Sequence, residues 1–335
     1  MKPELGATLE RLPRLELAQL PTPLHRLPRL SEELDIELWI KRDDCTGLAL
    51  GGNKARKLEF LLGGAVAGGC DTVVTTGGSQ SNHARLTAAA CRVAGLDCRL
   101  VLDRGLHPEN GNLLLDRLFG ARVEFVADQE PETAVAAMEQ LRQRLEQEGR
   151  KVYMIPRGGS VPTGASGYAA MTLELERQLS SLDLSDVSLY LATGSCGTHS
   201  GVMAGRAALG VSWRVQGISV SRPAAQQEDR VLQLSNETLT HLDLDSATIA
   251  SDVHVDDNFV GGGYGHPDNR TWEAIRLLAR SEGILLDPVY SGKAMAGLLA
   301  HVREGVVPAR STVVFLHTGG SPALFAYASE VEEMA

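Results

Sequence analysis

The stretch CDTVVTTGGSQSNHARLTAAACRVAG, residues 70–95, decides the fold of this chain. Its first part is an apolar run rich in β-branched residues that ends in Gly-Gly, which is typical of a buried strand. Its second part carries apolar residues at three- and four-residue spacing and ends in Gly95, which is typical of an amphipathic helix. A strand, a glycine turn and a helix in this order predict a parallel sheet covered by helices.

The same alternation continues along the chain. Further strand candidates lie at residues 98–104, 121–128, 151–156, 187–194, 215–221 and 312–320, and helix candidates lie at 53–69, 109–120, 131–149 and 201–210. No internal repeat or long linker separates two halves. We therefore expect an α/β fold in which a small domain, residues 55–158, is inserted into a large domain formed by residues 1–54 and 159–335.

Composition excludes several classes of protein. The 335 residues carry a formal net charge of −10, and Lys and Arg are scattered among Asp and Glu, which argues against a nucleic-acid partner. The sequence lacks both the apolar core of a signal peptide and a membrane-spanning run, so we expect a cytoplasmic protein without a membrane partner. The five cysteines have no zinc-binding spacing and suit a reducing compartment. We expect all five to be buried thiols, namely Cys45, Cys70, Cys91, Cys98 and Cys196. We also expect no metal site.

Several features of GGNKARKLEF, residues 51–60, converge on one lysine. The Gly-Gly turn precedes a stretch with helical periodicity, which places Lys54 on the first turn of a helix. The helix dipole and the neighbouring cations Arg56 and Lys57 should disfavour a proton on its amine. Lys54 is therefore a candidate nucleophile, whereas an ordinary surface lysine is the alternative.

Two loops between a predicted strand and a predicted helix could bind ligands, because open α/β sheets bind them at such points. In the first loop, Ser81, Asn82 and His83 begin a helix whose N-terminus suits a carboxylate or phenolate, although simple N-capping is the alternative. The second loop, ATGSCGTHSG at residues 192–201, resembles a phosphate cup. It lacks the spacing of a nucleotide or dinucleotide motif, so a monophosphate fits better, and a ligand-free glycine turn is the alternative.

Two tyrosines lie in glycine-rich turns of a chain that is only 4% aromatic, Tyr264 in GGGYG and Tyr290 in DPVYSGK. A phenol in such a turn is a candidate for proton transfer, and ordinary packing is the alternative.

The segments GGNKARKLEF, GSQSNHAR, ATGSCGTHSG, GGGYGHP, GILLDPVYSGKAMAGL and FLHTGGSPALFAY together resemble the D-cysteine desulfhydrase and 1-aminocyclopropane-1-carboxylate deaminase family over nearly the whole chain. This resemblance implies a two-domain, doubly wound α/β fold of the tryptophan synthase β type (fold type II), a homodimer, and pyridoxal 5′-phosphate in the cleft. It implies that Lys54 binds the cofactor covalently and that Asn82 contacts its 3′ oxygen. The implied phosphate loop comprises Gly194, Ser195, Cys196, Gly197 and Thr198, and Ser81, Tyr264 and Tyr290 fall at catalytic positions facing the substrate.

The residue after the DPVY tyrosine bears on the reaction. The ring-opening deaminases of this family carry Glu there, whereas this chain has Ser291. A hydroxyl, from Ser291 or Thr318, cannot hold a proton on the cofactor nitrogen by charge, which weakens the electron sink. This favours β-elimination from a small amino acid, most simply the loss of hydrogen sulfide from D-cysteine. We expect residues 81–83 to hold the substrate carboxylate and Lys54 or a tyrosine to act as the base.

Three alternatives remain open. An L-cysteate sulfo-lyase could pair a sulfonate with Arg157, although an ordinary ion pair would also explain that arginine. A 1-aminocyclopropane-1-carboxylate deaminase would open a ring instead. A non-catalytic amino-acid-binding protein on the same fold would need no covalent cofactor.

Overall fold

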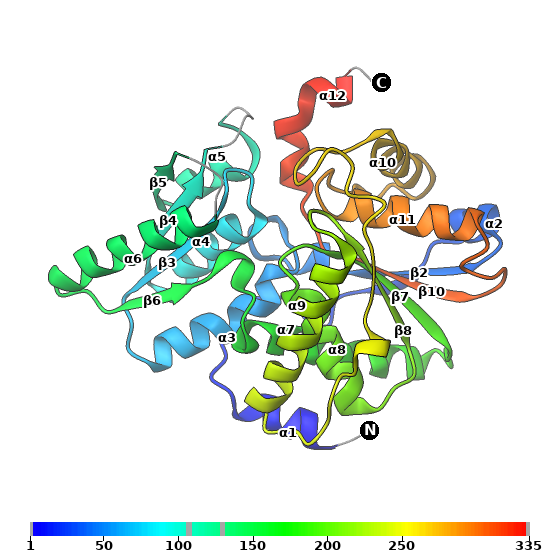
Figure 1. Cartoon of the computed structure of the whole chain (residues 1–335), viewed down its shortest axis with the longest axis horizontal. Coiled ribbons are helices and arrows are strands. Elements are labelled where there is room, and N and C mark those ends of the chain that lie inside the picture. Colours follow the sequence, from blue (N-terminus) through cyan, green and yellow to red (C-terminus); the bar gives the residue numbers. More distant parts are fainter. Residues whose placement is uncertain (1–2, 105–108, 128–130, 333–335) are drawn as a thin grey trace.

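The computed structural model describes residues 3–104, 109–127 and 131–332 and builds them around two sheets, which lie side by side in Figure 1. The four-stranded sheet has the order β5-β4-β3-β6 and is parallel throughout; it contains β3 (Thr72–Gly78), β4 (Asp97–Asp103), β5 (Arg122–Val126) and β6 (Val152–Ile155). The six-stranded sheet has the order β1-β2-β10-β7-β8-β9; it contains β1 (Leu24–Arg26), β2 (Glu37–Arg42), β7 (Val187–Thr193), β8 (Arg214–Ser219), β9 (His254–Asp256) and β10 (Thr312–His317). Its strands are parallel except for β1.

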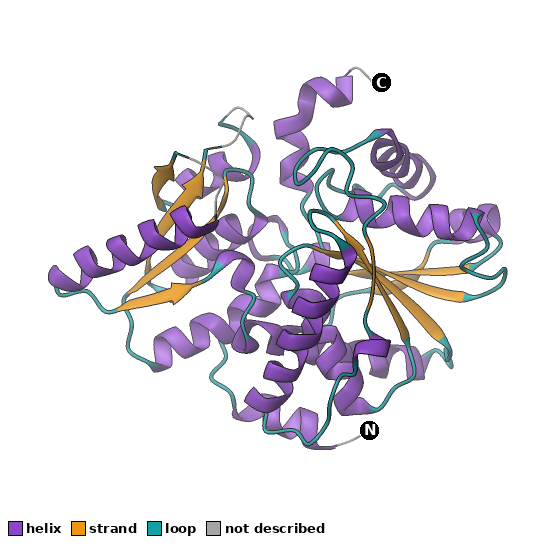
Figure 2. Ribbon diagram, in the orientation of Figure 1, coloured by secondary structure: helices purple, strands orange, loops and turns teal. Residues whose placement is uncertain are grey.

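Helices cover both faces of each sheet, so the fold is doubly wound (Figure 2). On the six-stranded sheet, α2 (Pro28–Leu34), α10 (Asn269–Glu282) and α11 (Ser291–Arg303) pack on one face, and α7 (Pro162–Ser181), α8 (Gly197–Leu209) and α9 (Ala224–His241) pack on the other. On the four-stranded sheet, α3 (Lys54–Ala67), α4 (Asn82–Ala94) and α5 (Gly111–Leu118) oppose α6 (Pro131–Gln147). The short helices α1 (Pro3–Arg11) and α12 (Ala328–Glu332) lie near the ends of the described chain.

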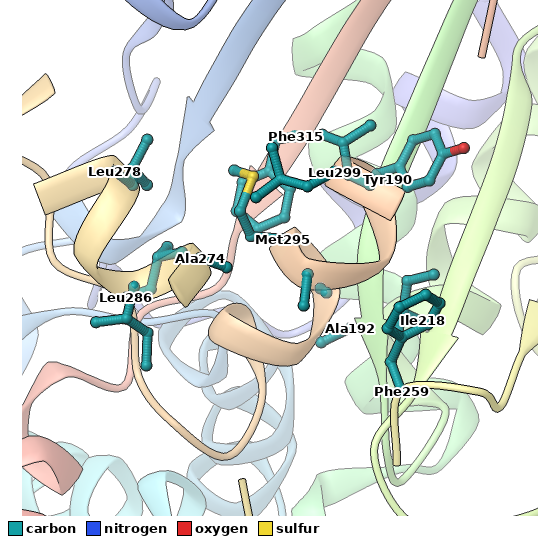
Figure 3. Packing of buried hydrophobic residues seen from close by; sticks show 14 of the residues in the cluster. Tyr190, Ala192, Ile218, Phe259, Ala274, Leu278, Leu286, Met295, Leu299 and Phe315 are labelled. Carbon is teal, nitrogen blue, oxygen red and sulfur yellow. The ribbon is translucent and has the colours of Figure 1, made fainter. Parts of the chain in front are cut away.

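The alternation of side chains along β10 explains why the sheet is covered on both faces. Val313 and Phe315 belong to the cluster formed with α10 and α11, part of which Figure 3 shows around Met295. Val314 and Leu316 point the other way and pack with α7 and α8. Because successive side chains of a strand face opposite sides, an unbroken apolar run requires a cover on both.

The strands expected from sequence are present as β3 to β8 and β10. Residue 128, at the end of one expected strand, lies outside the described residues. Strands β1, β2 and β9 were not expected. The four-stranded sheet falls within residues 55–158, but the proposed domain boundaries themselves remain a prediction.

A buried ionic cluster fixes the start of α3. Arg56 lies in the first turn of this helix, and its guanidinium pairs with Asp43 at 2.8 Å and with Glu174 at 2.9 Å. Glu174 also pairs with Lys41 of β2, and the Tyr168 hydroxyl donates to Asp43 at 2.7 Å. The cluster therefore connects α3 to β2 and α7 through Arg56, which lies two residues after Lys54.

The expectation that all five thiols are buried is wrong for two of them. Cys91, Cys98 and Cys196 are buried, whereas Cys45 is exposed and Cys70 is half-buried. Cys45 lies in a short 3-10 turn that follows β2 at the surface.

Within the described part of the chain, no helix has the length and apolar character needed to cross a bilayer.

Candidate active site

Two adjoining cavities lie where the strands of both sheets end. The inner cavity contains about 440 Å³ of space between the atoms of its wall, part of which is open to solvent. Its wall includes Asn53, Lys54, Asn82, Ala192, Gly194, Ser195, Cys196, Thr198, His199, Tyr290 and Thr318. The outer cavity shares Lys54, Gly194, Ser195 and Tyr290 with it. The structure thus brings together segments that are far apart in sequence.

Lys54 is the first residue of α3, as expected, and burial lowers the pKa of its amine to about 8. The expected cause was partly wrong, because Arg56 is bound in the ionic cluster and burial alone accounts for the shift. The Lys54 amine donates to the Gly158 carbonyl oxygen over a long 3.4 Å. A weakly held amine with a lowered pKa is available for covalent chemistry.

Lys57 lies one helical turn further along α3 and reaches the same carbonyl. Its amine donates to the Gly158 oxygen at 2.6 Å and to the Ser160 hydroxyl at 3.3 Å. A Cβ at Gly197 would lie 2.3 Å from this amine, so only glycine lets Lys57 approach the start of α8 so closely. Burial, and secondly the charge of Lys54, hold the pKa of Lys57 well below its ordinary value.

The loop of residues 194–198 leads from β7 into α8, whose first-turn amides have no partners within the helix. Cys196 adopts a left-handed conformation with φ of 71°, which turns the chain into the helix. The Ser195 hydroxyl accepts from Ser160 at 2.9 Å, and the Thr198 hydroxyl accepts from the Asn53 amide at 2.9 Å. Hydrogen bonds from two other segments therefore fix the position of the loop.

The start of α4 combines capping with polar groups that face the cavities. The Ser81 hydroxyl accepts from the Ala84 amide at 3.2 Å, so the capping interpretation is correct. Asn82 lines the inner cavity, and its oxygen accepts from Asn112 at 3.0 Å. Among the described residues, none accepts a hydrogen bond from its side-chain nitrogen, which suits the expected contact with a phenolate-like oxygen.

His83 lines the outer cavity but does not suit a substrate carboxylate. The Thr75 hydroxyl donates to the Ile155 carbonyl at 2.8 Å, so the His83 Nε2 must donate in its 2.9 Å bond with Thr75. Burial, and secondly the lysine charges of the site, hold the pKa of His83 well below its ordinary value. The ring is neutral and offers Nδ1 as an acceptor, so the side chain of His83 adds no positive charge for a carboxylate. Binding of the carboxylate by the helix start of residues 81–83 stays a prediction.

Tyr264 and Tyr290 meet in the outer cavity. Their hydroxyl oxygens are 2.5 Å apart, and their rings are packed edge to face with centroids 5.8 Å apart. Burial, and secondly Tyr264, raise the pKa of Tyr290 well above its ordinary value. Desolvation also raises the pKa of the Tyr264 phenol, which lines the cavity, although 43% of the Tyr264 surface is exposed. Both phenols are therefore proton donors, not bases, near neutral pH.

The loop that carries Tyr264 is fastened from α11. The buried Lys293 amine donates to the carbonyl oxygens of Val260 at 2.6 Å and Gly263 at 2.8 Å. The Tyr327 hydroxyl donates to the Gly265 carbonyl at 2.6 Å on the other side of Tyr264.

Ser291 is not among the residues that line either cavity. Its hydroxyl donates to the Asp287 carboxylate at 2.6 Å and accepts from the Asp287 amide at 2.8 Å, so it caps the turn that leads into α11. Thr318 does line the inner cavity. Of the two hydroxyls expected to face the cofactor nitrogen, the structure brings only Thr318 to the cavity.

Comparison with known proteins decides the family. Residues 15–319 match the family model described as pyridoxal-phosphate dependent enzyme. The chain belongs to the pyridoxal-phosphate dependent enzymes. It is 43% identical over 326 residues to the D-cysteine desulfhydrases of Salmonella choleraesuis strain SC-B67 and Salmonella paratyphi C strain RKS4594, which covers 95% of this chain and 97% of each relative.

Solved structures agree with this family. A crystal structure titled as an ACC deaminase homologue is 36% identical, with full coverage of both chains and a TM-score of 0.92. Threonine deaminase isoform 2 of Solanum lycopersicum, at 18% identity and a TM-score of 0.69, covers all of this chain and 90% of its own, and it shares the fold. The expected resemblance, the fold type II architecture and the cofactor are thereby confirmed.

The inner cavity of this pyridoxal-phosphate enzyme fits its cofactor chemically. Lys54 supplies an amine for the aldehyde. The amides at the start of α8 have no partners within the helix and suit a phosphate, although the Gly197 amide donates to the Ser160 hydroxyl at 3.2 Å. Sequence reasoning assigned Lys57 no place in the site; its amine lies against the same helix start, although the residue lines neither cavity. The signal was available in the three-residue spacing of the two lysines, which puts them on one helix face.

Proposed function

We propose that this enzyme removes hydrogen sulfide from D-cysteine by β-elimination and so yields pyruvate and ammonia. The observation that carries the proposal is the shared wall of the two cavities, where the Lys54 amine lies beside both the 194–198 loop and the tyrosine pair. The Salmonella relatives named as D-cysteine desulfhydrases, which match over nearly the whole chain, support the choice of substrate.

Each end of the cofactor has a holder in this proposal. Lys54 would bind it covalently, and residues 194–198 would hold its phosphate. The Lys57 amine lies behind the cavity wall against the start of α8 and would be charged beside a dianion. Asn82 would hold its 3′ oxygen, and the Thr318 hydroxyl would hold its nitrogen. Bound pyridoxal phosphate supplies a ring that takes up the electrons released at Cα of the substrate.

The acid and base roles follow from the pKa shifts. Lys54, with a pKa of about 8, is the base that removes the Cα proton, because the raised pKa values of both phenols keep them protonated. The hydrogen-bonded tyrosine pair donates a proton to the departing sulfur. The Ser81 hydroxyl and the start of α4 hold the substrate carboxylate. Released 2-aminoacrylate then hydrolyses in water to pyruvate and ammonia.

The cavity wall favours elimination over ring opening. Among the described residues that line the inner cavity, none carries a carboxylate. A hydroxyl there leaves the cofactor a weaker electron sink, and a good leaving group on Cβ needs less delocalisation because it carries the electrons away.

A keto-acid release assay tests the proposal with D-cysteine, β-chloro-D-alanine, L-cysteate and 1-aminocyclopropane-1-carboxylate. We expect pyruvate from D-cysteine and β-chloro-D-alanine. Turnover of the cyclopropane substrate alone would overturn the proposal.

Two further expectations complete the proposal. We propose a homodimer, which light scattering coupled to gel filtration would distinguish from a monomer of half the mass. We also propose a cytoplasmic location, since the described cysteines carry free thiols. Fractionation of the source cells would test it.

A further inference from the structure

We propose that Asn112 is a positioning residue, which holds the side-chain amide of Asn82 so that its nitrogen, and not its oxygen, faces the 3′ oxygen of the cofactor. The inference rests on the proposed contact between Asn82 and pyridoxal phosphate and deepens it. Asn112 itself lines neither cavity, so it acts through Asn82 and not on the cofactor directly.

Asn112 lies in the first turn of α5, which packs beside α4 (Figure 1), and its side chain is fully buried. The side-chain nitrogen of Asn112 donates to the Gln80 carbonyl oxygen at 2.9 Å and to Oδ1 of Asn82 at 3.0 Å. These two bonds engage both hydrogens of the amide. Residues that are 30 positions apart are thereby joined directly at the start of α4.

The Gln80 carbonyl decides which way round both amides lie. The oxygen and nitrogen of an asparagine amide are nearly alike in shape, so their hydrogen-bond partners must distinguish them. A backbone carbonyl only accepts, so the Asn112 atom beside Gln80 is the nitrogen. The same nitrogen contacts Asn82, so the Asn82 atom at this contact is the oxygen. The Asn82 nitrogen therefore lies on the opposite side of its amide.

The surroundings of Asn82 agree with this orientation. The buried Arg85 guanidinium also donates to Oδ1 of Asn82, over a long 3.5 Å. A Cβ at Gly320 would lie 3.0 Å from the Asn82 nitrogen, so glycine leaves room for this nitrogen beside the loop after β10. The same loop carries Thr318 of the inner cavity wall. Donors thus gather at the Asn82 oxygen, and its nitrogen faces the side on which an acceptor would bind.

Gln80 in turn holds Asn112 in place. The Asn112 backbone amide donates to Oε1 of Gln80 at 3.0 Å, and Nε2 of Gln80 donates to the Asn110 carbonyl at 2.8 Å. Gly111 lies between these two residues with a φ of 57°, and a Cβ there would come within 2.7 Å of Oε1 of Gln80. Only glycine allows so close an approach. The start of α5 is therefore fixed to the loop that leads into α4.

The orientation matters because the 3′ oxygen of the cofactor accepts hydrogen bonds. An amide nitrogen beside it stabilises its negative charge and so lowers the pKa of the bound cofactor, whereas an amide oxygen there would repel it. In an Asn112→Asp protein the side chain at this position offers oxygens only. The Asn82 amide would then turn its nitrogen toward α5 and present its oxygen to the cofactor.

The test measures the Kd for pyridoxal phosphate added to cofactor-free protein, and the pKa of the bound cofactor from its visible absorbance as a function of pH. We expect Asn112→Asp to raise the Kd about 10- to 150-fold, the fold-change for one charge-assisted hydrogen bond, and to raise the cofactor pKa. Asn112→Leu removes the donor without adding a charge, so it should shift both values in the same direction by less, and it serves if the aspartate variant does not fold.

Asn110→Asp is the matched control. It makes the same change of charge two residues away, where the side chain caps α5 by accepting from the Gly111 amide at 2.7 Å. Aspartate caps a helix as well as asparagine does, so neither the Kd nor the cofactor pKa should change.

The Asn82→Ala background separates the possible outcomes. There, Asn112→Asp should change the Kd by less than about threefold, because no amide remains to be turned. Equal losses in both backgrounds, or wild-type values for Asn112→Asp and Asn112→Leu, would overturn the positioning role. Wild-type values for Asn82→Ala alone would overturn the contact with the cofactor and this inference with it. Neither measurement uses turnover, so an enzyme that passes both but releases no pyruvate from D-cysteine would overturn only the proposed elimination.

Discussion

Replacement of Lys57 by methionine should separate cofactor binding from folding. The Lys57 amine is buried against the start of α8, and its low pKa means that the protein without cofactor derives little stability from its charge. Methionine has a similar length but removes the donor of the 2.6 Å hydrogen bond to the Gly158 carbonyl, so we expect the free energy of unfolding of the cofactor-free protein to fall by about 1–3 kcal/mol.

The cofactor should bind far more weakly to this variant. One charge-assisted hydrogen bond to a phosphate contributes about 1.5–3 kcal/mol, which corresponds to an increase of about 10- to 150-fold in the Kd for pyridoxal phosphate. The Kd is measured by titrating cofactor into protein stripped of it by hydroxylamine and dialysis. Lys151→Met, at an exposed position before β6, is the control. A Kd within about threefold of wild type for Lys57→Met would refute the assignment of Lys57 to the phosphate.

Three further predictions follow from the contacts around the site. Arg56→Met should lower the free energy of unfolding by about 3–5 kcal/mol, measured by urea denaturation, because Asp43 would be left buried without its partner. Lys293→Met should lower kcat, and the defect should not add to that of Tyr264→Phe, since the amine acts by fastening the loop of that tyrosine; additive losses in the double-mutant cycle would count against this role. Finally, kcat at saturating substrate should rise as pH increases through about 8, where Lys54 loses its proton. It should then stay level as long as the phenols remain protonated. A kcat that falls between pH 7 and 9 contradicts the assignment of Lys54 as the base.

Local patterns were sufficient to predict most of the fold and the centre of the site. The apolar runs that became β3, β7 and β10 are continuous because helices cover both of their faces. Lys54 could be placed because its Gly-Gly turn and the periodicity of α3 are adjacent in sequence.

Features that depend on distant partners could not be predicted in this way. Strand β2 has the sequence ELWIKR, which looks too polar for a buried strand, and its Lys41 is buried only because Glu174 of α7 pairs with it. The position of Lys57 depends on the close approach of Gly197 from another helix. Ser291 was expected near the cofactor nitrogen, but its hydroxyl donates to Asp287. This partner is only four residues away, so the capping turn could have been predicted from the sequence.

Reduction with borohydride followed by peptide mass spectrometry tests the central claim most directly, because it records which amine carries the cofactor. Lys54 and Lys57 share the Gly158 carbonyl, so the alternative attachment site lies next to the proposed one. We predict that the reduced cofactor is found on Lys54 and that Lys54→Ala protein keeps its fold but carries no borohydride-stable label. A label on Lys57 in the wild-type enzyme would contradict the account.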